Sequence, residues 1–157
     1  MNLSPSSSSF DIICITAPSN DICRVYNERC NVLKSSLLCL KDCKIYCIPD
    51  PKGYRIGSGG ATLNVLSYLN ENNEDLRISK VLIIHSGGNS QRAFIHSVCG
   101  KAWAGLNGLI CLGLDNNEKE TLATPMALLI KELILFSVNI PAGSCVVACS
   151  DVTLGII

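Results

Sequence analysis

Four short apolar runs constrain the fold of this chain more than any other feature. They are "FDIICITA" (residues 10–17), "CKIYCI" (residues 43–48), "KVLIIHS" (residues 80–86) and "SCVVACSD" (residues 144–151). The first is continuous rather than alternating and rich in β-branched residues, as in strands buried on both faces of a parallel sheet. We therefore predict strands at all four runs, the last a buried strand with Asp151 at its carboxyl end.

Helical patterns separate these runs. Ser19 or Asn20 can cap a helix whose apolar residues recur every three or four positions: Ile22, Tyr26, Cys30, Leu33 and Leu37. After a loop rich in proline and glycine (residues 49–60), "ATLNVLSYLNEN" (residues 61–72) predicts a short helix with Leu63, Leu66 and Leu69 on one face. Thr124 followed by Pro125 is a good start for a third helix, "MALLIKELILFSV" (residues 126–138).

Strand and helix patterns thus alternate along the chain, with a short extended piece expected at "LICLGL" (residues 109–114) before a polar run. The alternation predicts an α/β fold, a mostly parallel sheet flanked by helices. We expect residues 10–157 to form this fold and the serine-rich residues 1–9 to be a disordered leader. A chain of 157 residues has room for one full core.

The charge balance limits the function classes. Thirteen basic and thirteen acidic residues give no net charge, which argues against a broad electrostatic grip on nucleic acid or an anionic membrane. The N-terminus lacks the pattern of a secretory signal, and no run of 18 apolar residues is present, so we expect a cytoplasmic protein. Any anion that it binds must be held locally.

Ten cysteines are present, and most lie inside apolar runs. We interpret them as buried, reduced thiols that behave as small hydrophobic residues. Cys39, Cys43 and Cys47 are spaced unlike the ligands of a zinc site or an iron–sulfur cluster, so we reject a metal interpretation.

Three segments leave the carboxyl ends of predicted strands or follow them closely, and in an open α/β sheet such ends form the ligand-binding rim. The first, "GSGGATLN", offers Gly57, Gly59, Gly60 and Thr62 before a helix, where backbone N–H groups can approach an anion. It lacks the lysine of a phosphate-binding loop and the third glycine of a dinucleotide motif, so a tight structural turn is an equal alternative.

The second segment, "HSGGNSQRAFIHSVCGK", combines Gly87 and Gly88 with Arg92 and Lys101. Two glycines let the backbone approach a ligand, and the two cations can hold phosphate oxygens. The components suit a polyphosphate, although a glycine turn followed by two solvated cations has the same composition. We favour strand-end and loop roles for His85 and His96 over general-base catalysis.

The third segment, "SDVTLGII", begins beside Asp151. A carboxylate at a strand end is a suitable ligand for Mg²⁺ beside substrate phosphates, and a helix cap or turn would use the same residue.

Four stretches carry a family resemblance. "IGSGGATLNVL", "VLIIHSGGNSQR", "CGKAWAGL" and "VVACSDV" resemble, in the same order, the pyrophosphorylase domain of the fucose-1-phosphate guanylyltransferase family. A related domain begins the L-fucokinases. The resemblance covers residues 10–157 and implies a Rossmann-like sheet of the sugar-nucleotidyltransferase type. Because family members are several times longer, we expect this chain to hold only the nucleotide-binding part of an incomplete fold.

The resemblance implies a reaction in which GTP and L-fucose 1-phosphate give GDP-L-fucose and pyrophosphate. It implies catalytic roles for Arg92 and Lys101, a Mg²⁺ ligand at Asp151, and nucleotide contacts from Gly57, Gly59, Gly60, Thr62, Gly87, Gly88 and Ser90. Ala93 and Phe94 stand where the family commonly has Leu-Pro, which puts the loop shape in question. Two alternatives stay open: the N-terminal domain of an L-fucokinase, and a catalytically silent nucleotide-binding module.

Overall fold

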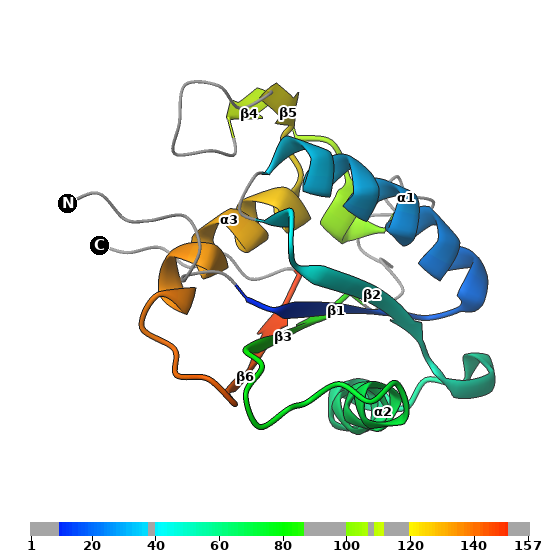
Figure 1. The fold of residues 1–157 in the computed structure, drawn as a ribbon. Helices are drawn as coiled ribbons and strands as arrows, with labels where there is room; N and C mark the ends of the chain where they lie inside the picture. The colour runs from blue at the N-terminus through cyan, green and yellow to red at the C-terminus, as the bar shows by residue number, and fades with distance from the viewer. Residues whose placement is uncertain (1–9, 38–39, 87–99, 107–108, 112–119, 151–157) are drawn as a thin grey trace.

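A computed structural model describes residues 10–37, 40–86, 100–106, 109–111 and 120–150 (Figure 1). It contains a four-stranded parallel sheet in the order β2-β1-β3-β6. The strands are β1 (Ile12–Ala17), β2 (Lys44–Pro49), β3 (Val81–His85) and β6 (Cys145–Cys149). The predicted α/β architecture with a parallel sheet is confirmed, and all four predicted strands are present.

Helices cover both faces of the sheet. Helix α1 (Asn20–Ser36) and helix α3 (Pro125–Ser137) lie on one face, and α2 (Gly57–Glu71) lies on the other (Figure 1). Two short antiparallel strands, β4 (Leu109–Cys111) and β5 (Glu120–Leu122), form a separate sheet. Single turns of 3₁₀ helix, η2 (Pro51–Gly53) and η4 (Lys101–Trp103), lie in connecting segments.

The core has two parts because β1 and β3 alternate their side chains between the two faces. Ile13 and Ile15 point toward α1 and α3, together with Leu82 and Ile84 of β3. Ile12 and Cys14 point toward α2 with Val81 and Ile83. Every residue of β1 is buried, which explains why its sequence is continuously apolar.

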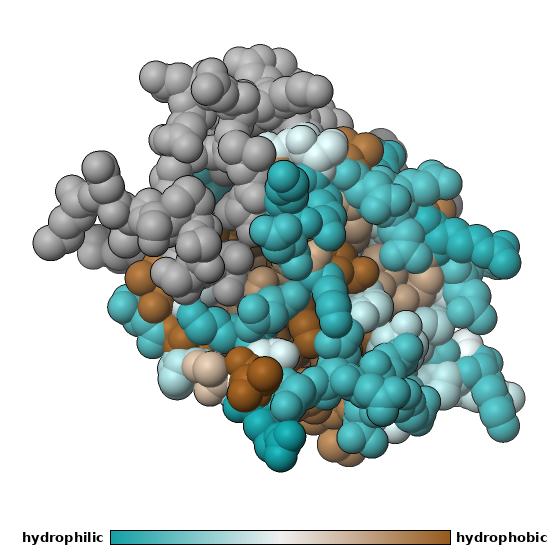
Figure 2. Space-filling model, in the orientation of Figure 1, coloured by the Kyte–Doolittle hydropathy of each residue, from teal (hydrophilic) through white to brown (hydrophobic). Residues whose placement is uncertain are grey.

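The predicted caps are confirmed at two helices. The side chain of Ser19 accepts a hydrogen bond from Ile22 N at the start of α1, and that of Thr124 accepts one from Ala127 N at the start of α3. Each replaces a bond that the first turn of a helix cannot make internally. The surface over α1 and β2 is largely hydrophilic, with apolar residues showing mainly in gaps (Figure 2).

The predicted inner face of α2 was partly wrong. Leu63 is 69% exposed, whereas Ala61, Val65 and Leu69 are buried. A spacing of four residues keeps these three side chains on one face of a 3.6-residue helix, while Leu63 falls outside that stripe. The helix also begins earlier than predicted, so the glycines of residues 57–60 form its first turn.

The last predicted strand is present as β6, but the prediction that it is buried was wrong. Val146 and Ala148 pack against the core on the α1 face, whereas Cys145, Val147 and Cys149 are exposed on the other. The interpretation of the cysteines as buried thiols therefore holds for Cys14, Cys23, Cys30 and Cys43 but fails for Cys145 and Cys149. Helix α2 covers the inner strands, and among the described residues nothing covers this face of β6.

The connection from β3 to β6 has an unusual hand. It crosses the sheet in the direction opposite to the connection from β1 to β2, yet α3 lies on the same face as α1. The two connections therefore have opposite hands, although crossover connections in parallel sheets are nearly always right-handed. This path carries η4 onto the face of α1, where Trp103 packs 5.7 Å from Tyr26 between ring centroids.

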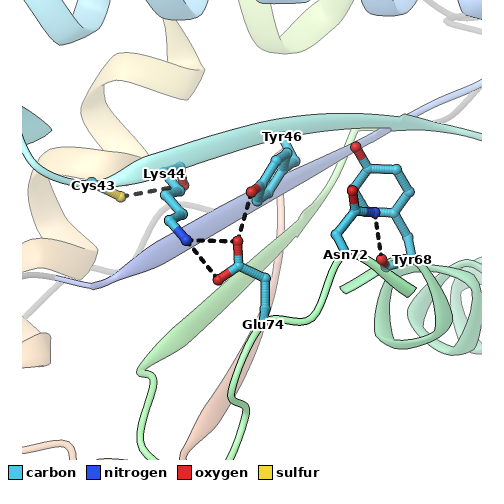
Figure 3. A network of polar contacts seen from close by, with 6 residues as sticks. All are labelled: Cys43, Lys44, Tyr46, Tyr68, Asn72 and Glu74. Atoms are coloured by element: carbon cyan, nitrogen blue, oxygen red, sulfur yellow. Dashed lines mark hydrogen bonds and ion pairs between the residues drawn. The ribbon is translucent and has the colours of Figure 1, made fainter. Parts of the chain in front are cut away.

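A polar cluster lies at the amino-terminal end of strand β2 (Figure 3). Lys44 Nζ donates to both carboxylate oxygens of Glu74 at 2.8 Å, and Tyr46 Oη donates to Glu74 Oε1 at 2.7 Å. The Glu74 side chain is only 10% exposed, and these bonds hold its pKa below the usual range. The bond to Glu74 raises the pKa of Tyr46 to about 12. The cluster ties β2 to the segment after α2.

We expect Tyr46→Phe to lower the free energy of unfolding by about 1–2 kcal/mol, because it removes a hydrogen bond to a charged group. The folded chain holds the Tyr46 proton more tightly than the unfolded chain, so this contribution is complete below about pH 10 and is lost as the pH rises toward 12. Urea titrations at pH 7 and above pH 10 measure both effects. Tyr54→Phe, at a side chain that is 73% exposed, is the matched control. Equal unfolding energies for the two variants would contradict the prediction.

Candidate functional site

The carboxyl ends of the parallel strands form one rim. Asp50 N donates to Ala17 O, which joins the ends of β2 and β1, and Ser150 N donates to His85 O, which joins the ends of β6 and β3. The segments that follow β3 and β6 therefore begin side by side. This arrangement is the one predicted for segments leaving the ends of parallel strands.

His85 lies at the centre of the rim and is held by two threonines. Thr62 Oγ1 donates to Ser58 O at 3.0 Å and lies 3.0 Å from His85 Nε2. Ser86 N donates to Thr16 Oγ1, which lies 3.4 Å from His85 Nδ1. When the one hydroxyl proton of Thr62 is used in the bond to Ser58 O, Thr62 accepts from His85 Nε2–H, and Nδ1 is left as the acceptor on the Thr16 side. Both ring nitrogens are engaged, which favours a positioning role over general-base catalysis.

Burial determines the titration of His85. Partial burial lowers its pKa below that of a free histidine, and the negative charge of Asp50 opposes the shift. The neutral ring is consistent with the hydrogen-bond network around it.

A pocket of about 210 Å³ opens between the ends of β1, β2 and β3 and the start of α2. Ala17, Pro18 and Ala61 supply apolar surface, and His85 is among the polar lining residues. The remaining lining residues are Thr16, Asp50, Arg55, Gly57 and Ser58. This volume is smaller than that of most small-molecule sites, so the pocket suits one part of a larger ligand.

The glycines predicted at the second glycine loop have different environments. Gly57 has φ +69° and lines the pocket, whereas Gly59 lies in the first turn of α2 with open space around its Cα. A Cβ at Gly60 would lie 2.9 Å from Ile56 Cβ, so packing within the first turn requires glycine there. Thr62 contacts His85. The N-cap residue, Ile56, has no side-chain bond to the first turn.

Lys101 begins η4, and its side chain is exposed. The preceding Gly100 has φ +73°, and a Cβ there would lie 2.7 Å from Tyr26 Oη. Tyr26 Oη also donates to Ser86 O at 3.3 Å and accepts from Ser86 Oγ at 3.2 Å. Ser86 and Gly100, which flank residues 87–99 in the chain, therefore both lie against one hydroxyl of α1.

Several predicted site residues lie outside the described residues. They are Gly87, Gly88, Ser90, Arg92 and Asp151. The described residues around them place the chain that leads to each: Ser86 at the end of β3, Gly100 before η4, and Ser150 after β6.

Comparison with known proteins decides the family. A family model described as the fucose pyrophosphorylase domain matches residues 73–156, more than half of the chain. The chain belongs to this family. The chain is 38% identical over 99 residues to "Fucose-1-phosphate guanylyltransferase" of Mus musculus, covering 62% of the chain and 17% of that protein. It is 33% identical over 147 residues to "Fucose-1-phosphate guanylyltransferase" of Homo sapiens, covering 92% of the chain and 22% of that protein.

The chain thus spans about a fifth of the length of these curated relatives. No solved structure matches it significantly. The matched range of the fucose pyrophosphorylase domain includes the second predicted segment and all but the last residue of the third, whereas residues 57–62 precede it. Among the described residues, no helix has both the length and the apolar content needed to cross a membrane.

Sequence reasoning missed four residues that shape the rim: Tyr26, Asp50, Arg55 and Gly100. Tyr26 was recognised only as part of an apolar stripe, and Gly100 was not singled out. Asp50 and Arg55 were assigned to a loop. The charges of Asp50 and Arg55 were the signal that could have identified them, because a turn built from proline and glycine does not need an acidic or a basic side chain.

We expect Gly100→Ala to lower the free energy of unfolding by about 1–3 kcal/mol more than Gly53→Ala. Both glycines have positive φ, near +72°, so both variants carry backbone strain. Only the new methyl group at position 100 overlaps a neighbour, the Tyr26 hydroxyl. Denaturant titrations measure the difference, which should shrink in a Tyr26→Phe background. Equal losses would show that Tyr26 does not restrict Gly100.

We expect Asp50→Asn to lower the pKa of His85 further, because it removes the charge that opposes the effect of burial. Titration of the His85 ring by NMR measures the shift. Asp42→Asn is the matched control, since Asp42 is exposed and precedes β2 at the opposite edge of the sheet. An unchanged or raised pKa in Asp50→Asn would contradict the arrangement of the pocket.

Proposed function

We propose that this chain is the nucleotide-binding part of a fucose-1-phosphate guanylyltransferase, which forms GDP-L-fucose and pyrophosphate from GTP and L-fucose 1-phosphate. The match to the fucose pyrophosphorylase domain carries the proposal, because its range includes the segments with Arg92, Lys101 and Asp151. The names of the curated relatives supply the nucleotide and sugar classes. The rim geometry supports it, since those segments leave adjacent strand ends.

In this reaction the phosphate oxygen of the sugar attacks the α-phosphorus of GTP, and pyrophosphate departs. The chain's contribution is to orient the phosphates and to neutralise the charge that develops on them. Gly87 and Gly88 let the backbone approach the phosphates, with Ser90 in the same segment. Arg92 stabilises the departing pyrophosphate, and Lys101 contacts the α-phosphate or the sugar phosphate.

Asp151 is the proposed Mg²⁺ ligand. It follows Ser150 in the chain, whose N–H donates to His85 O at the rim, and a carboxylate beside phosphates is a suitable Mg²⁺ ligand. When bound, Mg²⁺ neutralises phosphate charge. Near the rim, Gly57, Gly59 and Gly60 let a second stretch of backbone contact the nucleotide. Thr62 contributes by holding the ring of His85.

Incubating the 157-residue chain with GTP, Mg²⁺ and L-fucose 1-phosphate and measuring pyrophosphate tests the reaction. Calorimetric titration with GTP and Mg²⁺ tests binding separately. We expect Arg92→Ala and Lys101→Ala each to weaken GTP binding about tenfold to a hundredfold, because each removes charge-assisted hydrogen bonds to phosphate. Lys41→Ala, at an exposed lysine just before β2, is the control.

The outcomes separate the alternatives. Binding without pyrophosphate release indicates a silent nucleotide-binding module or a part that needs the rest of the longer protein. A folded chain that does not bind GTP in the presence of Mg²⁺ contradicts the proposed function. An L-fucokinase parent would instead be shown by a kinase motif downstream of this domain in the transcript.

A further inference from the structure

Asp50 lines the rim pocket, and no described residue engages its carboxylate. Asp50 occupies the N-cap position of η2 but makes no capping hydrogen bond with its side chain. It is half-buried, and the carboxylate accepts no hydrogen bond from the described residues. Acidic side chains are rarely removed from water without a partner. A carboxylate in this state is suited to accept hydrogen bonds from a ligand.

The other walls of the pocket define the kind of ligand. Ala17, Pro18 and Ala61 present apolar surface, and the ring of His85 is fixed by Thr16 and Thr62. Asp50 would repel a phosphate group, and the apolar surface of Ala17, Pro18 and Ala61 suits the face of a ring better than the hydroxyl groups of a sugar. A flat aromatic ring with N–H groups along one edge satisfies both the walls and the carboxylate.

We propose that this pocket binds the guanine ring of the nucleotide and that Asp50 distinguishes guanine from adenine. Guanine presents two adjacent donors, N1–H and the N2 amino group, which a carboxylate can accept together. Adenine presents a lone pair at N1. The carboxylate of Asp50 would then face another acceptor, and no hydrogen bond could form between the two. The assignment rests on the proposed function, because it identifies which part of its nucleotide occupies the pocket.

Two further features agree with this placement. Arg55 also lines the pocket, and a guanidinium can donate to the O6 and N7 acceptors of guanine. His85 lies two residues before Gly87 in the chain, a reach of about 7 Å at most. The walls of the pocket thus end close to where the proposed phosphate-binding segment begins.

The test compares nucleoside triphosphates that differ in the edge of the base. The 157-residue chain and its Asp50→Asn variant are titrated with GTP, ATP and xanthosine triphosphate in the presence of Mg²⁺. We expect the unmodified chain to prefer GTP over ATP by about tenfold or more, and Asp50→Asn to weaken GTP binding by a similar factor. Asp42→Asn is the control for loss of one charge. Thermal unfolding verifies that each variant is folded.

Xanthosine triphosphate tests for tighter binding by Asp50→Asn, a result that a misfolded variant cannot give. Xanthine keeps N1–H but has a carbonyl in place of the N2 amino group, so an asparagine amide matches it through one acceptor and one donor. We expect Asp50→Asn to bind xanthosine triphosphate more tightly than the unmodified chain does. An unchanged ratio of GTP to ATP affinity in Asp50→Asn, with no gain for xanthosine triphosphate, would overturn the proposal.

The sugar of the nucleotide is a competing partner for Asp50. If the effect of Asp50→Asn is equal for all three bases and disappears with 2′-deoxy-GTP or 3′-deoxy-GTP, the carboxylate contacts the ribose and the base assignment is wrong. An effect of Asp50→Asn that persists with both deoxynucleotides supports the contact with guanine.

A titration with guanosine separates this proposal from the proposed function. Guanosine has no phosphates, so its binding depends on the base and sugar contacts alone. We expect it to shift the NMR signals of the Ala17 and Ala61 methyl groups in the unmodified chain and much less in Asp50→Asn. These shifts would support the pocket even if GTP fails to react. If the folded chain responds to neither guanosine nor GTP, both proposals fail, whereas GTP binding without response at Ala17 and Ala61 rejects the pocket alone.

Discussion

The burial of β1 and β3 on both faces is the constraint on which the rest of the structure depends. Ile13 and Ile15 need cover from α1 and α3, and Ile12 and Cys14 need cover from α2. Each fully buried aliphatic side chain stabilises the fold by about 1.5–3 kcal/mol, so neither layer of helices can be lost. Because the strands are parallel, satisfying this constraint brings their carboxyl ends together. The rim that carries the candidate site is therefore a consequence of how the core is built.

The sequence predicts those features that depend on local chemistry. The continuous apolar run of β1 indicates burial on both faces, and Ser19 and Thr124 mark helix starts because their hydroxyls satisfy backbone groups nearby. It does not predict features that depend on distant neighbours. Val147 resembles Ile83 in the sequence, but α2 covers only the latter. The face on which α3 packs is equally invisible, because an apolar stripe does not specify which side of a sheet it meets.

Tyr26 shows the same limit within the site. Tyr26 falls in the apolar stripe of α1, which predicts a core residue, and it is only 3% exposed. Its hydroxyl, however, bonds Ser86 and lies where a side chain at position 100 would stand. One residue of α1 thus restrains both ends of the segment between β3 and η4. The hand of the β3–β6 connection makes this possible, because it carries η4 to the face of the sheet that α1 covers.

The charged residues at the two ends of the parallel strands have opposite roles. At the amino-terminal end, Glu74 accepts bonds from Lys44 and Tyr46, and its charge is satisfied within the protein. At the carboxyl ends of the strands, threonines engage the ring of His85, while the half-buried carboxylate of Asp50 accepts no hydrogen bond from the part of the chain that the structure describes. A satisfied carboxylate stabilises the fold, and an unsatisfied one carries a desolvation cost that a ligand can offset. Asp50 thus stands out at the rim because its carboxylate, unlike that of Glu74, accepts no hydrogen bond from the described residues in return for that cost.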